Sequence, residues 1–479
     1  MSNIRPHRPG NRVVRKRLDA QTIITLQDDP RVESAPTTAS HAKIFVMAVM
    51  VIVAVGTTLL MLPWATEDRH STNIIDALFT AVSAFSVTGL ATVDTQSHWS
   101  FLGEFIILVL IQLGGFGFMA GTSMILIILG RGASLRANMM MQDGSPTMSL
   151  HEVYTFSRRI VRYIVVAEII GAIVLTLHFA RYEAPVTAVW WGVFHSISAF
   201  CNAGFDLQVT SPSMNGHTRS PIALTTVALL IQLGSLSFMV VADVWRQRRW
   251  KSLQLDTKLV LLVNFSLIAI SALWFLIVEW NAALAPIDTG WKPLNAAFQA
   301  ISARTAGFTS ADWSQAHNAT MYLWIVVMMV GGAAGSTAGG VKLATIGVVF
   351  MAVISTLKGR PEPQAFGRRI AHQVVYRALA LIAIFMSVHF LISMMLVMSE
   401  DIFNTEHFSF LSLMFEAMSA LATVGLSTGI TSMLSDGGKL VLILGMFIGR
   451  LGPITLVYAL TRRMQVERFR YPEANIRIG

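Results

Sequence analysis

The feature that most constrains this chain is a series of long stretches without any charged residue. Six such stretches cover residues 44–66, 105–130, 220–242, 259–278, 313–341 and 378–399. Two more, residues 163–180 and 440–461, carry one charge each, Glu168 and Arg450. About 20 apolar residues in a helix cross the hydrocarbon core of a bilayer. The eight stretches therefore predict an all-α integral membrane protein.

The composition excludes most soluble classes of protein. Of the 479 residues, 54% are hydrophobic and 13% are charged, whereas about 25% are charged in a typical soluble domain. The polar surface that a soluble multi-domain enzyme needs is therefore missing. A polytopic membrane enzyme is the alternative from another class. The sequence offers it no HExxH motif, no GxSxG motif and no aspartate pair on one helix, so we expect no enzyme and no catalytic residues.

Most basic residues gather in five clusters that alternate with pairs of apolar stretches. They lie in residues 1–43, 131–162, 246–258, 358–377 and 462–477. The positive-inside rule places such clusters, and with them both termini, in the cytoplasm. The net charge of +9 would also suit a nucleic-acid partner, but no soluble basic face is available to bind one. Residues 1–43 lack the apolar core of a signal peptide and predict a cytoplasmic N-terminal arm.

A short apolar segment that ends in glycine recurs once between the two stretches of each pair. The glycines are Gly89, Gly204, Gly307 and Gly425, spaced 115, 103 and 118 residues apart, and each is followed by Leu or Phe. A Ser-Ala pair stands six and five residues before three of the glycines, and one residue later in the third copy. The pattern predicts four repeats over residues 44–131, 158–250, 258–358 and 375–462, followed by a cytoplasmic tail over residues 463–479.

Each short segment predicts a half-helix that stops near the Ser-Ala pair and returns as extended backbone, because it is too short to span. Such backbone is tolerated at membrane depth only where it lines a cavity. Glycine adopts positive φ readily, and four carbonyl-lined loops around one axis could replace the water shell of a cation. The predicted cation-binding residues are Val87, Thr88, Gly89, Asn202, Ala203, Gly204, Thr305, Ala306, Gly307, Thr423, Val424 and Gly425. For one copy, a glycine that only permits close helix packing is the alternative; four aligned copies disfavour it.

The third repeat carries a glycine-rich interruption in its second apolar stretch. Gly331, Gly332, Gly335, Gly339 and Gly340 lie within ten residues that contain no bulky side chain, and Lys342 follows. Each glycine lowers helix stability by up to ~1 kcal/mol, so the run predicts an unwound loop that gates the pore below the filter. Close helix packing is the alternative reading. Arg450, isolated in its apolar stretch, is predicted to face the pore and help hold it closed.

Four further residues receive individual predictions. Arg304 and Glu416 are predicted to pair behind the filter and support it, because an isolated intramembrane charge is unfavourable. The alternative is that Arg304 reaches external water. His195 has no second ligand three or four residues away, so we expect it to form hydrogen bonds within its half-helix, and no metal site besides that of the transported ion. Cys201 is expected to be a packed thiol.

These motifs resemble the Trk/Ktr/HKT superfamily of potassium transporters. The four glycine segments are similar to its P-loops, residues 331–342 to its intramembrane gating loop, and residues 447–453 to its last-helix arginine motif. The resemblance runs from about residue 44 to the C-terminus. It implies four M1–P–M2 units, each with two spans around a pore half-helix, about one central pore. The chain resembles the KtrB-like branch, because its first span leads directly into the first loop and because Gly89 stands where plant-like members often have serine.

The resemblance also implies a function and partners. The chain would be the channel-like subunit for K⁺ uptake in a Ktr-type system of the cell membrane, forming a homodimer on a KtrA-like cytoplasmic ring that binds a nucleotide. The chain has no GxGxxG in a βαβ setting, so we expect no cofactor in this chain and the nucleotide on the partner. Na⁺ is a candidate activator. A Trk-like or sodium-preferring cation transporter is the alternative, since each loop has one glycine where potassium channels have two.

Overall fold

The computed structural model describes residues 38–117, 119, 150–207, 213–404 and 408–462. Of residues 1–47, the described part is the beginning of one helix, and residues 48–479 form a second unit. The predicted N-terminal arm and C-terminal tail lie almost wholly outside the described residues, as do Arg131 and Arg136 of the second basic cluster.

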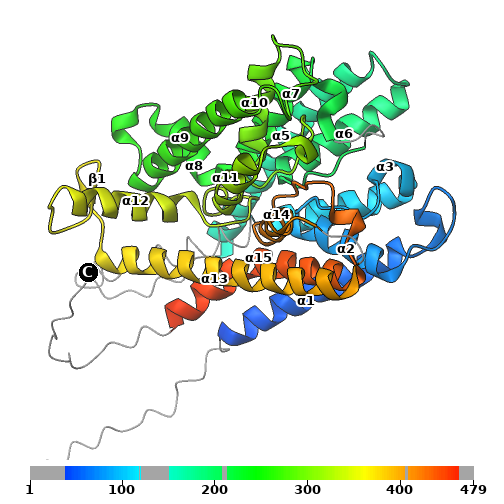
Figure 1. The fold of residues 1–479 in the computed structure, drawn as a ribbon. Coiled ribbons are helices and arrows are strands. Elements are labelled where there is room, and N and C mark those ends of the chain that lie inside the picture. Colours follow the sequence, from blue (N-terminus) through cyan, green and yellow to red (C-terminus); the bar gives the residue numbers. More distant parts are fainter. Residues whose placement is uncertain (1–37, 118, 120–149, 208–212, 405–407, 463–479) are drawn as a thin grey trace, which may run out of the picture. The chain divides into compact units, whose positions relative to one another are not determined.

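The described chain is mostly helical (Figure 1). Its α-helices are α1 (Thr38–Leu60), α2 (Ile74–Ser86), α3 (Thr95–His98), an unlabelled helix Phe101–Gly117, α5 (Leu150–Phe179), α6 (Pro185–Cys201), α7 (Pro221–Ser235), α8 (Ser237–Gln247), α9 (Leu255–Val278), α10 (Lys292–Ser302), α11 (Asn318–Met329), α12 (Leu343–Leu357), α13 (His372–Phe403), α14 (Phe410–Leu421) and α15 (Asp436–Arg462). Single 3-10 turns are η1 (Pro63–Ala65), η2 (Ser213–His217), η3 (Trp250–Ser252), η4 (Trp313–Gln315) and η5 (Thr431–Met433).

One small hairpin interrupts the helical pattern in the fourth basic cluster. Strands β1 (Gln364–Ala365) and β2 (Arg368–Arg369) pair antiparallel, with Gln364 opposite Arg369. The turn residues Phe366 and Gly367 have φ of 49° and 75°, the signature of a type I′ turn. The hairpin connects α12 to α13.

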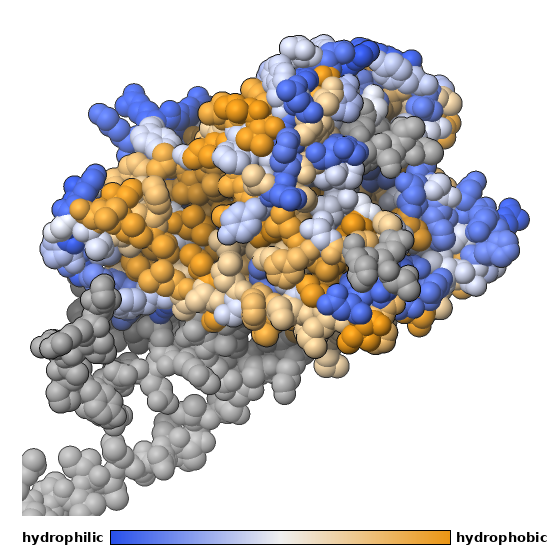
Figure 2. Space-filling model, viewed as in Figure 1, coloured by the Kyte–Doolittle hydropathy of each residue, from blue (hydrophilic) through white to orange (hydrophobic). Residues whose placement is uncertain are grey.

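Within the described residues, three helices are long and apolar enough to cross a membrane: the segment Ser157–Phe179 of α5, then α9 and α13. Helices α7 and α8 reach the same length only together, and they meet at an angle of 98°. Other predicted stretches fall on shorter apolar helices, such as Val46–Leu60 and Phe101–Gly117. On the face seen in Figure 2, apolar residues form a wide zone with hydrophilic residues at its ends, as expected for a surface in lipid.

The second apolar stretch of repeat two is not one continuous helix. It breaks at Leu236, where Ser237 has a φ of 66°. The residues around the break are Gly234, Ser235 and Ser237, and glycine and serine pairs are a common cause of sharp helix kinks. In repeat three the predicted interruption is confirmed, because α11 ends at Met329 and α12 begins at Leu343.

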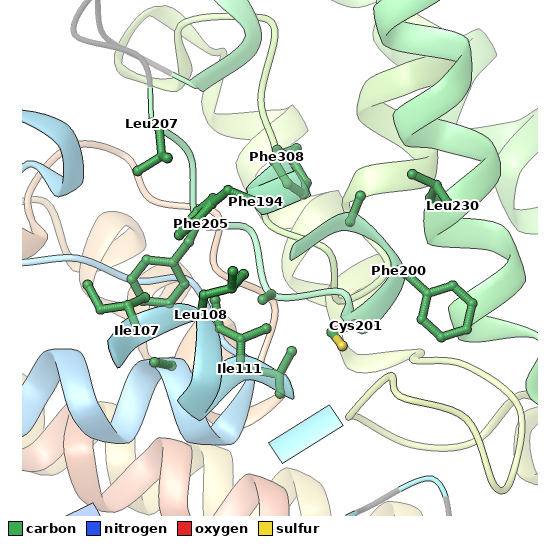
Figure 3. Close-up of a cluster of buried hydrophobic side chains, with 14 of the residues drawn as sticks. Ile107, Leu108, Ile111, Phe194, Phe200, Cys201, Phe205, Leu207, Leu230 and Phe308 are labelled. Atoms are coloured by element: carbon green, nitrogen blue, oxygen red, sulfur yellow. The ribbon is translucent and has the colours of Figure 1, made fainter. Parts of the chain in front are cut away.

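Each short helix that leads to one of the four repeat glycines packs against neighbouring helices. Helix α6 contacts α5 and α7, α10 contacts α9 and α7, α14 contacts α11, α13 and α15, and α2 contacts α15. Around α6 the core is rich in large apolar side chains: Phe205 lies beside Ile107 and Leu108 (Figure 3). This packing fixes the ends of the short helices, where the candidate site begins.

Candidate ion pathway

The four short helices α2, α6, α10 and α14 all end shortly before the predicted filter glycines. Their last residues are Ser86, Cys201, Ser302 and Leu421. In three copies the helix continues past the Ser-Ala pair that was expected to end it; in α10 it stops at Ser302 itself. The backbone then runs without helix through each predicted cation-binding segment.

Two residues of each segment have left-handed backbone. The glycines Gly89, Gly204, Gly307 and Gly425 have φ of 90°, 71°, 75° and 91°. The residues two places earlier, Val87, Asn202, Thr305 and Thr423, have φ of 57°, 60°, 63° and 51°. Positive φ is a genuine outlier for β-branched residues such as Val and Thr, and such strain concentrates at functional sites. The same strained geometry in four copies argues for one shared task.

The four segments form a closed ring. A Cβ at Gly89 would lie 2.2 Å from the carbonyl oxygen of Ala203, and one at Gly204 would lie 2.8 Å from that of Ala306. A Cβ at Gly307 would lie 2.7 Å from the carbonyl oxygen of Val424, and one at Gly425 would lie 2.0 Å from that of Thr88. The last contact returns to the first segment. Each glycine therefore lies against the carbonyl that precedes the next glycine, and only a residue without a side chain fits there.

The serine of the Ser-Ala pair ties each loop to its helix. Ser83 Oγ donates to the carbonyl of Leu90 at 2.7 Å and accepts from the amide of Gly89 at 3.1 Å. Ser198 donates to Phe205, and Ser302 to Phe308, so the one-residue offset in the third copy preserves the bond. The apolar residue after each glycine is buried, with Leu90, Phe205, Phe308 and Leu426 no more than 2% exposed. Both features explain why Ser and Leu or Phe accompany the glycine in all four copies.

A second set of glycines, which the sequence analysis missed, supports the short helices from behind. A Cβ at Gly114, Gly234 or Gly449 would lie 1.8–1.9 Å from the carbonyl oxygen of Phe85, Phe200 or Leu421 respectively. Each of those carbonyls stands four residues before a filter glycine. Two of these glycines end a repeated Ile-Gln-Leu-Gly motif, at residues 111–114 and 231–234. This repeat in the sequence could have identified them. The third repeat differs, because Gly331 lies against Gly339 of its own loop.

The predicted pairing of Arg304 with Glu416 is wrong. Arg304 is fully buried and donates to Asn264 Oδ1 on α9 and to the carbonyl of Gly331, at 3.1 Å for the second bond. Glu416 instead accepts from Ser427 Oγ, Thr431 Oγ1 and the Thr428 amide, at 2.7, 2.9 and 2.9 Å. Each side chain thus stabilises a loop of its own repeat. Local hydroxyl and amide donors satisfy the carboxylate, so it needs no cation.

The glycine-rich segment is buried between the second and fourth filter segments. Its ends are joined by a bridge between Val330 and Val341. The amides of Ala333 and Thr337 donate to the carbonyls of Ser235 and Gly234, at 2.8 and 3.2 Å. Those carbonyls lack helical partners because α7 breaks there. A Cβ at Gly339 would lie 2.1 Å from Thr423 Oγ1, so the segment also lies directly against Thr423, one of the predicted cation-binding residues.

Besides Arg304, which binds the carbonyl of Gly331, two basic side chains hold carbonyls of this segment. Arg450, 3% exposed, donates to the carbonyl of Thr337 at 2.6 Å and to that of Gly114 at 3.1 Å. Lys342 Nζ donates to the carbonyls of Ala338 and Gly339 at 2.7 and 3.3 Å. Arg450 therefore joins the glycine-rich segment to the helix Phe101–Gly117.

His195 and Cys201 have the environments that the sequence suggests. His195 is buried; its Nδ1 contacts the carbonyl of Trp191 at 2.7 Å and its Nε2 contacts Asp206 Oδ1 at 2.5 Å. Cys201 is 1% exposed, and its thiol lies 3.6 Å from Gln112 Oε1. Gln112 in turn donates to Glu168 at 3.2 Å, so the carboxylate in the apolar part of α5 has a polar partner.

Comparison with known proteins agrees with this geometry. Residues 20–470 match the TrkH family of cation transport proteins. The chain is 34% identical to the potassium/sodium uptake protein NtpJ of Enterococcus hirae, over 92% of this chain and 97% of that protein. It is 35% identical to the Ktr system potassium uptake protein B of Vibrio alginolyticus, over 91% of this chain and 94% of that protein.

A solved structure shares the fold. The potassium transporter TrkH from Vibrio parahaemolyticus is similar over 89% of this chain and 86% of that chain, with a TM-score of 0.70 and 19% identity. The family match covers almost the whole chain, and the described helices are apolar on their outer faces. The chain therefore belongs to the TrkH family of cation transport proteins, is similar to its KtrB-like members, and is a multi-pass membrane protein.

Proposed function

We propose that this chain is the ion-translocating, channel-like subunit of a K⁺ uptake system. The closed ring of glycines and carbonyls at Gly89, Gly204, Gly307 and Gly425 is the observation that carries the proposal. A ring of backbone carbonyls can replace the hydration shell of a cation. The names of the relatives, which are potassium or potassium/sodium uptake proteins, support K⁺ as the transported ion.

The proposed architecture has four M1–P–M2 repeats around one pore. Helices α2, α6, α10 and α14 would be the pore half-helices, with their C-termini directed at the filter. The remaining apolar helices would supply eight spans, with the basic clusters and both termini on the cytoplasmic side of the cell membrane. The kinked α7–α8 pair and the broken α11–α12 pair would each count as one span.

Polar side chains next to the ring fit a hydrated pathway. Asn202, Thr305 and Thr423 are buried, yet their side-chain polar atoms have no hydrogen-bond partner in the described residues. They occupy equivalent positions in three repeats. Buried polar atoms are seldom left unpaired, so water or the passing ion is the natural partner. Carbonyls would coordinate the ion, which is why Val87 is tolerated at the fourth equivalent position.

The glycine-rich segment 331–340 would be the gate. It has few helical bonds of its own, and Arg450 and Lys342 hold its carbonyls. A ligand on the partner would shift the segment between two arrangements. Deleting residues 335–338 should raise K⁺ flux and reduce its dependence on the partner. A deletion variant that folds but shows unchanged flux and unchanged partner control would make the segment a packing device only.

The proposed partners are a second copy of this chain and a KtrA-like cytoplasmic ring that carries the nucleotide, with Na⁺ as a candidate activator. The Vibrio alginolyticus relative is named protein B of a Ktr system, and this name supports an assembly of more than one kind of subunit. The basic ends of the spans, such as Lys358 and Arg360, would face this ring.

A sodium-preferring transporter is the second candidate. Its support is the name of the Enterococcus hirae relative, a potassium/sodium uptake protein, and the single glycine in each filter segment.

One experiment separates the two. K⁺ and Na⁺ uptake would be measured in a cell that lacks its own K⁺ uptake systems, with and without a KtrA-like ring protein. The proposal expects half-maximal uptake at a lower external concentration of K⁺ than of Na⁺. It also expects faster uptake in the presence of the ring protein. Higher affinity for Na⁺ would support the second candidate, and uptake of neither ion would contradict both.

A further inference from the structure

The break between α7 and α8 leaves backbone groups that other elements satisfy. The carbonyl of Leu233 accepts from Tyr163 Oη at 2.8 Å, and the next two carbonyls hold the glycine-rich segment, as described above. Ser237 is buried with a left-handed backbone. Tyr163 of α5 is therefore hydrogen-bonded to the backbone directly before the 98° bend.

A groove opens beside this bend, between α5 and the α7–α8 pair. It has a volume of about 540 Å³. Its walls are Tyr163, Val166, Ile170, Leu233 and Phe238. Val166 and Ile170 are 49% and 58% exposed. An apolar groove on the outer face of a membrane helix suits an acyl chain, because the methylene groups make van der Waals contacts along it.

Two arginines stand at one end of the groove. Arg159 and Arg162 line it, and they lie three residues apart on α5, so they share one face of the helix. Both are exposed, and neither has an ion-pair partner among the described residues. Guanidinium groups bind phosphate through paired N–H donors. The end of the groove therefore offers a positive charge where a lipid headgroup would lie.

Helix α8 has the features of a helix at a membrane surface. Trp245 is 74% exposed, and the Arg248 guanidinium lies 5.8 Å from the centre of its ring. Arg246, Arg249 and Lys251 are close in sequence. Tryptophan with basic residues is typical of the boundary between lipid and water, and basic clusters on the cytoplasmic side attract anionic lipids.

We propose that the groove between α5 and the α7–α8 bend binds an anionic phospholipid of the inner leaflet, with an acyl chain against Val166, Ile170 and Phe238 and the phosphate on Arg159 and Arg162. The proposal rests on the proposed membrane orientation. It adds a lipid ligand to the transporter. The bound lipid lies next to Tyr163 and Leu233, one residue from the carbonyls that hold the glycine-rich segment.

The test uses the full-length protein in detergent with added phosphatidylglycerol or phosphatidylcholine, and counts retained lipids by native mass spectrometry. The wild type should retain phosphatidylglycerol in preference to phosphatidylcholine. The double variant Arg159→Gln/Arg162→Gln should lose most of this preference, by about tenfold. Arg158→Gln is the matched control, because Arg158 is an exposed arginine of the same turn that does not line the groove, and it should bind as the wild type does.

A second variant tests the groove without changing charge. Val166→Trp would fill it and should also reduce lipid retention, while size-exclusion chromatography and thermal unfolding check that each variant is folded. Equal phosphatidylglycerol retention by wild type and double variant, or no preference for the anionic lipid in the wild type, would overturn the proposal. A shift in oligomer mass in place of lipid loss would also overturn it, by assigning the groove to a second copy. Because lipid retention is measured without transport, failure here is distinct from failure of the proposed K⁺ uptake.

Discussion

The Arg450 guanidinium donates a hydrogen bond of 2.6 Å to the backbone carbonyl of Thr337. Arg450 lies in α15 and Thr337 in the glycine-rich segment, so this bond joins the last repeat to the third. The same guanidinium also reaches Gly114. A hydrogen bond from a charged donor contributes about 1.5–3 kcal/mol, and this one adds to the backbone bonds that join the segment to Gly234 and Ser235.

Arg450→Ala should therefore release the glycine-rich segment and raise the rate of K⁺ uptake, with little change in affinity. Rate and affinity would be measured as the maximal velocity and half-saturating K⁺ concentration of uptake in cells. Thr337→Ala is the control, because it keeps the backbone carbonyl that Arg450 binds and removes only the side-chain bond to Phe200. An unchanged maximal rate in the Arg450 variant would contradict a closing role for this residue.

Substitution of the rear glycines tests how the short helices are held. Gly114→Ala and Gly449→Ala would place a methyl group 1.8 Å from the carbonyl oxygens of Phe85 and Leu421. The helices must shift, and overpacking of this kind destabilises by about 1–3 kcal/mol. We expect a lower thermal unfolding midpoint and weaker K⁺ over Na⁺ discrimination. Gly117→Ala, where no atom of the described residues lies within 4 Å of the added methyl group, should behave like the wild type.

The new partners of Arg304 can be tested by double-mutant cycles on thermal unfolding of the purified protein. Arg304→Ala combined with Asn264→Ala should show a coupling free energy of about 0.5–3 kcal/mol, because the two side chains are bonded. Arg304→Ala combined with Glu416→Ala should be additive within about 0.5 kcal/mol. Coupling in the second cycle but not the first would restore the pairing that the structure rejects.

His217, in the loop before α7, should make the protein acid-sensitive. Burial, together with the neighbouring His178, lowers the pKa of His217 from 6.5 to about 4. A histidine with a lowered pKa takes up its proton more readily when unfolded. Its stabilisation is complete above pH 6.5 and is lost as the pH falls toward 4. His217→Asn should therefore flatten the fall of the unfolding midpoint between pH 6.5 and 4.5; an equally steep fall in the variant would exclude this residue as the cause.

The sequence predicts well where the short helices give way to the four glycine segments, and the reason is physical. A glycine that lies against a neighbouring carbonyl cannot be replaced by a larger residue. Gly89 and its three equivalents therefore recur at regular intervals in the sequence. The glycine-rich interruption is likewise predictable, because no helix tolerates it easily. The expected environments of His195 and Cys201 are also confirmed, because a small thiol and an imidazole within a short apolar helix have few other places to lie.

Other features depend on tertiary contacts that leave no local pattern. The left-handed backbone of Val87 contradicts the local preference of a β-branched residue. The partner of Arg304 lies 40 residues away on α9, and nothing in the spacing of charged residues points to Asn264. The bend at Leu236 follows from Gly234, Ser235 and Ser237, a composition that many straight helices also contain. Packing between helices determines such features, and the local sequence is merely compatible with them.

The central claim is that Gly89, Gly204, Gly307 and Gly425 line one selectivity filter. Its most direct test is the competition between K⁺ and Na⁺ for uptake in four single Gly→Ser variants, with Gly290→Ser as control, since Gly290 has open space around it. A serine at any ring position would meet the next carbonyl and disfavour the required positive φ. The account predicts weaker K⁺ affinity and reduced K⁺ over Na⁺ selectivity in every ring variant and neither change in the control; wild-type affinity and selectivity in all four ring variants would contradict it.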